Sequence, residues 1–368
     1  MWKLIHCFKH CNKLQTLNFA ANIATCGLET VLKHCDMVSL RTLSLSTYGG
    51  CHGDDPGGEW PFGSQSNLES SLKRLSSLFT DHCGRGLMTT LRLSHPAVDA
   101  SITKSVVQWP ARLVRFDLTM VKYTEYAHQY TAFAVQKMLD HHKESLECVR
   151  LGILSQDQGS TYFIPDLSQF LRLRTLQLSS YNLLQENPLV AAEKLGGNAC
   201  MLKYLDVSFS MEIPDPDTFY DFQLDDVQWF RDFVTRMKSQ DVTPNRSPSQ
   251  RLDSIHINCN PVQHLPTFEI CIPALKDRIR VHPWPWEHVD QAAKAVGKLG
   301  IKMTYTATFT KREWVRGVRR AWRKERCCYA IGRATIAPQW GPVFGTVPDP
   351  QPRGIERYFK PAANGKAS

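Results

Sequence analysis

Eight copies of one apolar pattern, Leu-x-x-Leu-x-Leu, restrict how this chain can fold. The clearest copy is Leu173, Leu176 and Leu178. Its last two leucines are two residues apart, and side chains two apart lie on the same face of a β-strand. Each copy therefore predicts a short strand with one apolar face, entered through the first apolar residue. The other copies are Leu14/Leu17/Phe19, Leu40/Leu43/Leu45, Met88/Leu91/Leu93, Leu113/Phe116/Leu118, Leu146/Val149/Leu151, Leu202/Leu205/Val207 and Leu252/Ile255/Ile257.

The spacing of these copies is typical of a leucine-rich repeat. Their first residues are 26, 48, 25, 33, 27, 29 and 50 residues apart, and a leucine-rich repeat takes roughly 20–29 residues. A unit this small cannot bury its apolar face alone, so neighbouring units must stack. The sequence predicts an α/β fold, a leucine-rich-repeat solenoid curved as a horseshoe, with a parallel sheet on the inner face and helices outside. Two later apolar groups, Ile279/Val281 and Ile301/Met303/Tyr305, raise the estimate to about ten repeats.

The domain organisation follows from where this pattern continues and where it stops. We expect the solenoid to cover residues 1–309, with a Gly- and Pro-rich irregular insertion at 46–67. Because no polar cap precedes the first repeat, we expect an upstream segment or a partner to cover that end. Residues 310–328 are predicted to form a basic amphipathic C-terminal helix. The Pro/Gly-rich tail 329–368 is predicted to be largely disordered.

Helical spacing of apolar residues predicts the connections between the strands. In the longest, residues 125–143, Tyr126, Tyr130 and Phe133 are assigned to the buried face. His141 and His142 are assigned to a solvated C-terminal turn. The other helices are predicted at 22–35, 68–79, 164–171, 188–199, 222–238 and 287–299.

Several function classes are disfavoured by what the sequence contains. No apolar run is long enough to span a bilayer, and the first residues do not form a signal peptide. The twelve cysteines are interpreted as small buried thiols in a reducing compartment, the cytoplasm or the nucleus. No Cys-x-x-Cys or zinc-finger spacing and no catalytic or nucleotide-binding motif occurs. We therefore expect no metal, no cofactor and no enzymatic activity.

The inner face of the predicted sheet is the first candidate binding surface. Side chains alternate along a strand, so the second, third and fifth residues of each pattern are expected to face solvent there. Mixed charges with a basic excess suit an extended or acidic protein segment, although a solvated face without a partner remains the alternative. The candidate residues are Arg41, Arg92, Arg115, Arg150, Arg174, Lys203, Tyr204, Asp206 and His256.

The basic segment 311–326 is the second candidate surface. It holds eight basic and two acidic residues, so it supplies +6 of the chain's net +9. Trp314, Val318 and Trp322 recur every four residues along one helical face. The segment is interpreted either as a helix that caps the open end of the solenoid or as a binder of nucleic acid or anionic membrane. We rank nucleic acid below a protein partner. The basic residues concerned are Arg312, Arg316, Arg319, Arg320, Arg323 and Lys324.

The repeats resemble those of the F-box/leucine-rich-repeat proteins, the substrate receptors of cullin-RING ubiquitin ligases. The runs from Cys11 to Phe19 and from Cys200 to Ser208 carry the resemblance, which covers roughly residues 1–305. It implies a non-enzymatic protein-protein interaction scaffold that presents a substrate on the inner face. No F-box is visible ahead of Leu14, so the ligase adaptor is an expected partner only with an upstream F-box. The alternative function is the nucleic-acid or membrane-surface binder acting through residues 311–326.

Overall fold

The computed structural model describes part of the chain. The chain divides into two compact units, Met1–Trp314 and Val315–Ser368. All the described residues belong to the first unit, so the fold is that of this unit alone. The described residues are 14–20, 39–46, 77, 79–80, 83–94, 100–119, 127–156, 163–196, 201–209, 222–240, 252–258, 286–306 and 312.

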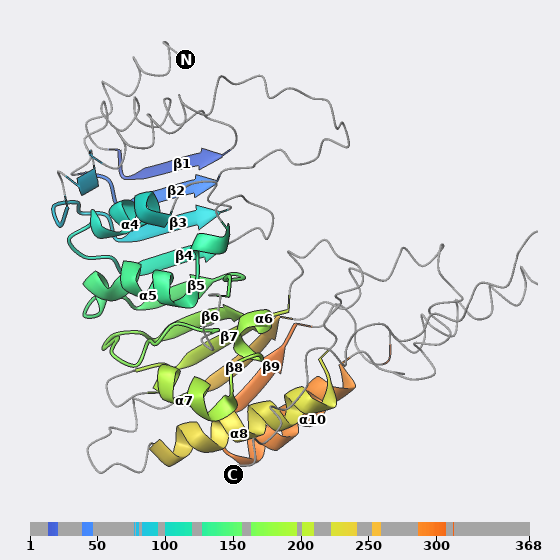
Figure 1. Ribbon diagram of the computed structural model, residues 1–368. Coiled ribbons are helices and arrows are strands. Elements are labelled where there is room, and N and C mark those ends of the chain that lie inside the picture. Colours follow the sequence, from blue (N-terminus) through green and yellow to red (C-terminus); the bar gives the residue numbers. More distant parts are fainter. Residues whose placement is uncertain are drawn as a thin grey trace, which may run out of the picture. The chain divides into compact units, whose positions relative to one another are not determined.

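Nine parallel strands form one sheet, and their order in the sheet follows their order in the chain (Figure 1). The eight strands predicted from the apolar pattern are confirmed, and the group around Met303 forms the ninth. The strands are β1 (Thr16–Ala20), β2 (Thr42–Ser46), β3 (Thr90–Ser94), β4 (Arg115–Thr119), β5 (Cys148–Leu151), β6 (Thr175–Ser179), β7 (Tyr204–Ser208), β8 (Ser254–Asn258) and β9 (Lys302–Tyr305).

The register of the sheet aligns the apolar pattern from strand to strand. The fourth residue of each copy pairs with the fourth residue of the next, as Leu17 does with Leu43 and Leu176 with Leu205. Across all nine strands this side chain is at most 8% exposed. One face of the sheet therefore forms the core, as the two-residue spacing predicts.

A repeated pair of backbone hydrogen bonds joins the copies at their second residue. The carbonyl oxygen of Arg174 accepts from the N–H groups of Lys203 and Tyr204, each at 2.9 Å. The carbonyl of Lys203 accepts in turn from Asp253 at 2.9 Å and Ser254 at 3.1 Å. Because the chain enters successive strands along the same path, side chains at equivalent positions come into line. The same pair of bonds recurs at Gln15, Arg41, Thr89, Val114 and Glu147.

In several of the connections between strands, the described residues form helices, and these helices pack on one another. In the described part, α4 contacts α5, α7 contacts α8, and α8 contacts α10; Figure 1 shows the last three helices side by side. The result is an α/β fold in which an all-parallel sheet alternates with helices. The helices with described bounds are α4 (Ala100–Gln108), η1 (Ala127–Gln129), α5 (Ala132–Leu139), η2 (Asp140–His142), α6 (Ser180–Leu183), α7 (Pro188–Gly196), α8 (Leu224–Gln240) and α10 (Glu287–Lys298).

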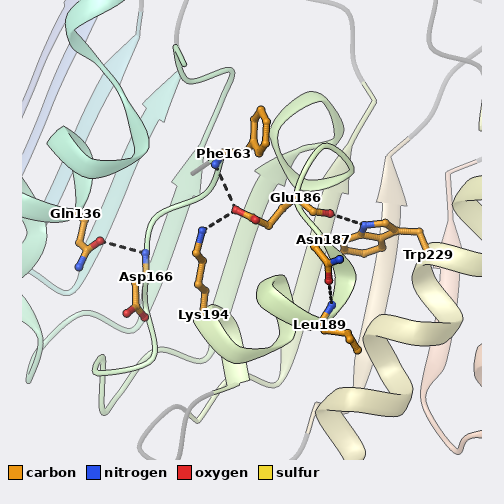
Figure 2. A network of polar contacts seen from close by, with 8 residues as sticks. All are labelled: Gln136, Phe163, Asp166, Glu186, Asn187, Leu189, Lys194 and Trp229. Atoms are coloured by element: carbon orange, nitrogen blue, oxygen red, sulfur yellow. Dashed lines mark hydrogen bonds and ion pairs between the residues drawn. The ribbon is translucent and has the colours of Figure 1, made fainter. Parts of the chain in front are cut away.

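A buried polar network ties the helical connections together (Figure 2). The Glu186 carboxylate accepts from the Phe163 N–H at 3.3 Å and pairs with the Lys194 ammonium at 2.6 Å. The side chains of Glu186 and Lys194 are only 6% and 10% exposed, respectively. The Glu186 backbone carbonyl accepts from the Trp229 indole N–H at 2.8 Å. One residue thereby links the segment before β6 to both α7 and α8.

The long helix predicted over residues 125–143 is instead three short pieces, η1, α5 and η2. Thr131 interrupts it, because this residue forms a parallel bridge with Ser155 and caps α5 through a hydrogen bond from the Ala134 N–H. The prediction that Phe133 is buried is wrong, since its side chain is 55% exposed. Residues before and after the break do not belong to one continuous helix. The apolar spacing that includes Tyr126 and Tyr130 therefore does not tell which way Phe133 faces.

The prediction of a solvated His141–His142 turn is wrong for the second residue. His141 is exposed, whereas His142 is 1% exposed. Its Nε2 lies 2.7 Å from the Val107 carbonyl oxygen, and the Leu113 N–H points at its Nδ1 from 3.4 Å. These contacts fit a neutral ring that donates from Nε2 and accepts at Nδ1. Burial lowers the pKa of His142, and the charge of His141 adds to that effect.

Two further predictions are corrected. Residues 164–171 form turns and bends rather than helix, with the Ser168 N–H bonded to the Asp166 carboxylate at 3.0 Å. Strand β8 pairs directly with β9, which leaves no place between them for the strand predicted at Ile279 and Val281. Those two residues lie outside the described part, as do residues 22–35, 47–67 and, apart from Arg312, 310–368.

Candidate partner-binding face

The second face of the sheet carries the third and fifth residues of each apolar pattern. Parallel pairing aligns the fifth residues in one continuous line across nine strands, which we call the fifth-position row. It contains charged groups of both signs together with uncharged polar groups. The row consists of Asn18, Ser44, Arg92, Asp117, Arg150, Gln177, Asp206, His256 and Thr304.

Three arginines lie around Asp117 near the middle of the row. The Arg115 Nε is 3.1 Å from both Asp117 carboxylate oxygens, and its Nη2 is 3.1 Å from Oδ2. The Arg92 Nε lies 3.3 Å from the same Oδ2. Arg150 is the in-register neighbour of Asp117 on β5. Its side chain is exposed and makes no hydrogen bond or ion pair within the described part.

Burial distinguishes the aspartate from its arginines. Asp117 is 7% exposed, whereas the side chains of Arg92 and Arg115 are 51% and 40% exposed. Burial lowers the pKa of Arg115, but the hydrogen bond and the charge of Asp117 raise it more, so the net pKa is raised. Asp117 therefore acts as an internal counter-ion that orients two guanidinium groups while leaving their outer edges in solvent.

Cys148 lies close enough to the three arginines to feel the charge of each. It pairs in register with Arg115 and is half-buried. Burial raises the pKa of its thiol, while Arg115, Arg150 and Arg92 each oppose that rise electrostatically. The neutral thiol adds no charge to the group. The sequence pattern could have located Cys148, because it is the third residue of its copy, but its uncharged side chain gave no reason to select it.

The predicted residues Arg41, Arg174 and Lys203 lie at the entrance to the strands rather than in the row. Arg41 and Arg174 are exposed, and Lys203 is half-buried. The Arg41 guanidinium donates to the Leu87 carbonyl oxygen at 3.1 Å. The carbonyl groups of Arg174 and Lys203 accept the paired backbone hydrogen bonds at two successive strand entrances, so the two residues occupy equivalent places on neighbouring copies of the pattern.

Towards β9 the face carries Tyr204, Asp206 and His256. Tyr204 is 49% exposed. The Asp206 Oδ1 is buried and has no hydrogen-bond partner within the described part. Burial raises the pKa of Asp206, against the opposing charges of His256 and Arg150. The two ring nitrogens of His256 each lie 3.0 Å from a threonine hydroxyl, those of Thr304 and Thr306.

His256 is held in place by two neighbours. Both of its ring nitrogens are engaged by threonine hydroxyls. Sequence reasoning assigned Arg92, Arg115 and Asp117 to this face but did not predict that the aspartate joins the two arginines. The signal was present, since Asp117 occupies the fifth position between Arg92 and Arg150. Thr306 lies outside the apolar pattern and could not have been found from it.

The second predicted surface lies almost wholly outside the described part. Arg312 is exposed and helical. The remaining basic residues stay predictions: Arg316, Arg319, Arg320, Arg323 and Lys324.

A scan against models of known protein families and a search of curated proteins both find no match to this chain. No helix in the described part is long and apolar enough to cross a membrane. Among the same residues, no group of three or more His, Cys, Asp or Glu side chains is arranged to hold a metal ion.

Proposed function

We propose that this chain is a leucine-rich-repeat solenoid that acts as a non-enzymatic protein-interaction scaffold, with its partner bound along the fifth-position row. Support for the repeat assignment comes from the sequential parallel sheet and from the identical carbonyl bonds at successive strand entrances. Successive small units that share one core are typical of such arrays.

One observation carries the binding proposal. The fifth-position row places side chains of both charge signs in register on the face opposite the apolar core. Arg150 is exposed in this row, and Arg174 is exposed at the entrance to β6. No hydrogen bond or ion pair of either guanidinium is found among the described residues, and half-exposed Tyr204 adds an aromatic ring. Arginine and tyrosine are the residue types enriched where proteins bind proteins.

The resemblance to F-box/leucine-rich-repeat proteins extends the proposal to a substrate receptor of a cullin-RING ubiquitin ligase. In that role the row holds the substrate, and an upstream F-box provides the contact with the ligase adaptor. Co-purification of cullin-ligase components with the full protein from its source cell tests this extension separately from the binding face.

The binding face is tested by reversing charge at Arg150 and Arg174 in one protein, Arg150→Glu/Arg174→Glu. Arg115 is left unchanged because it pairs with buried Asp117, so its reversal would disturb the fold. The matched control is Lys104→Glu/Arg231→Glu. It changes the net charge of the protein by the same amount, but at exposed positions on α4 and α8. Each tagged protein is used to capture partners from lysate of the source cell, and bound proteins are quantified by mass spectrometry.

We expect at least one protein captured by both the unchanged chain and the control to be lost from the row variant. Charge reversal across an interface repels the partner, whereas exposed changes away from packing move stability by about 0.5 kcal/mol or less each. Identical capture by all three proteins would contradict the proposal. So would unfolding of the row variant together with its milder form Arg150→Gln/Arg174→Gln, because these arginines would then be structural.

A further inference from the structure

We propose that Arg92, Arg115 and Arg150, grouped around Asp117, bind a phosphorylated side chain in an extended segment of the partner. These four residues form the arginine cluster. The inference rests on the proposed function and names the chemistry of the partner. Binding a phosphate group at this place has three requirements. Three cationic side chains must be able to reach one anion, enough of their N–H donors must be free of other partners, and the net charge of the cluster must favour a dianion.

The first requirement is met by register and by the internal counter-ion. Arg92, Asp117 and Arg150 are fifth-position neighbours on β3, β4 and β5, and neighbouring strands are about 4.8 Å apart. Arg115 reaches Asp117 from the third position of the same strand. Asp117 holds Arg92 and Arg115 toward each other, so part of the ordering cost of binding is already met.

The second requirement concerns the N–H donors. A guanidinium has five N–H groups in a fixed planar fork that matches phosphate oxygens. Arg92 contacts Asp117 through Nε, which leaves its terminal nitrogens uncommitted within the described part. All the donors of Arg150 are uncommitted there too. These donors lie on the open face of the sheet, where a ligand can approach.

Charge decides between a phosphate and a carboxylate. Three arginines and one aspartate leave the cluster at +2, since Cys148 is neutral. A phosphoserine carries about −1.5 to −2 charges near pH 7, whereas a glutamate carries one. A phosphorylated residue therefore neutralises the cluster, and a carboxylate leaves an uncompensated cation on a partly buried face. Bidentate arginine–phosphate bonds add to this preference.

A second contact sets the spacing within the partner. Asp206 lies two strands beyond Arg150 in the same row, and its buried Oδ1 has no hydrogen-bond partner within the described part. Two strand spacings are about 10 Å, and an extended segment advances about 3.3 Å per residue. A segment crossing the strands would thus place a lysine or arginine three residues from the phosphate in reach of Asp206.

The test uses immobilised full-length protein and synthetic peptide libraries. Three libraries share degenerate flanks and differ at one fixed central residue: phosphoserine, serine or glutamate. A fourth combines the central phosphoserine with lysine fixed three residues away on both sides. Retained peptide is quantified by mass spectrometry for the unchanged chain and three variants: Arg150→Gln, Asp206→Asn and the control Arg231→Gln, which alters an exposed arginine on α8.

We expect the phosphoserine library to be retained at least tenfold over the serine and glutamate libraries. Arg150→Gln should remove most of that preference and Arg231→Gln none of it. Lysine at three residues should increase retention severalfold, and Asp206→Asn should abolish that increase alone. Equal retention of the three simple libraries, or a phosphate preference that survives Arg150→Gln, would overturn the inference. So would retention of the protein on phosphatidylserine vesicles with no peptide preference.

The two proposals fail in different ways. If lysate capture depends on Arg150 and Arg174 but no phosphate preference appears, the scaffold stands and the phosphate assignment is wrong. If capture is also indifferent to both arginines, the binding face itself is wrong.

Discussion

Asn182 offers a direct test of how one side chain holds two repeats together. Its Oδ1 accepts from the Leu154 N–H at 2.9 Å, and its Nδ2 donates to the Leu154 carbonyl at 3.0 Å. Both residues are 2% exposed. Asn182→Ala leaves a buried donor and a buried acceptor unpaired, each at a cost of about 1–3 kcal/mol. Because the vacated space is polar and could admit a water molecule, we expect the lower part of the sum, about 2–4 kcal/mol.

The matched control is Asn187, five residues further on. It caps α7, with its Oδ1 accepting from the Leu189 N–H at 2.9 Å and Pro188 at the first helical position. It is exposed, so Asn187→Ala should cost about 1 kcal/mol, the usual value for a lost N-cap. Asn182→Asp keeps the acceptor but places a buried carboxylate oxygen against the Leu154 carbonyl oxygen, so at neutral pH it should cost at least as much as Asn182→Ala.

Urea unfolding of the three variants measures these differences as midpoint shifts at unchanged slope. Hydrogen exchange should show faster exchange at the Leu154 amide in Asn182→Ala and no change there in Asn187→Ala. The reasoning is refuted if Asn182→Ala costs no more than Asn187→Ala, since the Leu154 backbone would then find other partners without loss.

Three further predictions concern buried or paired charges. Lys194→Met should destabilise by about 3–5 kcal/mol, because it leaves Glu186 without its cation; adding Glu186→Gln should recover part of that loss in urea unfolding. Burial raises the pKa of Asp226 to about 6 from 3.8, against a hydrogen bond from a backbone N–H. The folded protein binds the Asp226 proton more tightly than the unfolded chain does, so the stabilisation from this carboxyl group is fully present below about pH 4 and is lost as the pH rises through about 6. Asp226→Asn should therefore flatten the dependence of the unfolding free energy on pH. At pH ~7.5 it should stabilise the folded protein by up to about 3 kcal/mol. Arg115→Gln should cost about 1–3 kcal/mol by removing a hydrogen-bond partner from a buried carboxylate, whereas Arg150→Gln should stay within about 0.5 kcal/mol.

The strands were predictable because the apolar pattern is local. Two apolar residues spaced by two define a buried strand face, and nothing distant can change which residues share that face. All eight patterned strands formed, including the copy with Phe116 in place of a leucine. The helices were less predictable. α4 was not predicted, although Val106 and Val107 are buried there, because no regular apolar spacing extends over a long enough window.

The environments of His142, Phe133 and Asp117 were decided by tertiary contacts. His142 is buried because residues 107 and 113 provide its hydrogen-bond partners, and these lie about one repeat earlier in the chain. Phe133 is exposed because the bridge between Thr131 and Ser155 resets its helix. Such contacts join residues that sequence periodicity does not relate.

The amino-acid sequence by itself determined which residues face the core and which lie on the opposite face of the sheet. It also carried the order of the strands, since each unit must cover the apolar side of its neighbour. Only the tertiary structure decided which of the opposite-face residues meet. Arg92 and Arg115 come from different strands, and parallel register together with Asp117 brings them to one point. The apolar pattern indicates which positions align between strands, but it does not encode the side-chain orientations that direct Arg92 and Arg115 to one carboxylate.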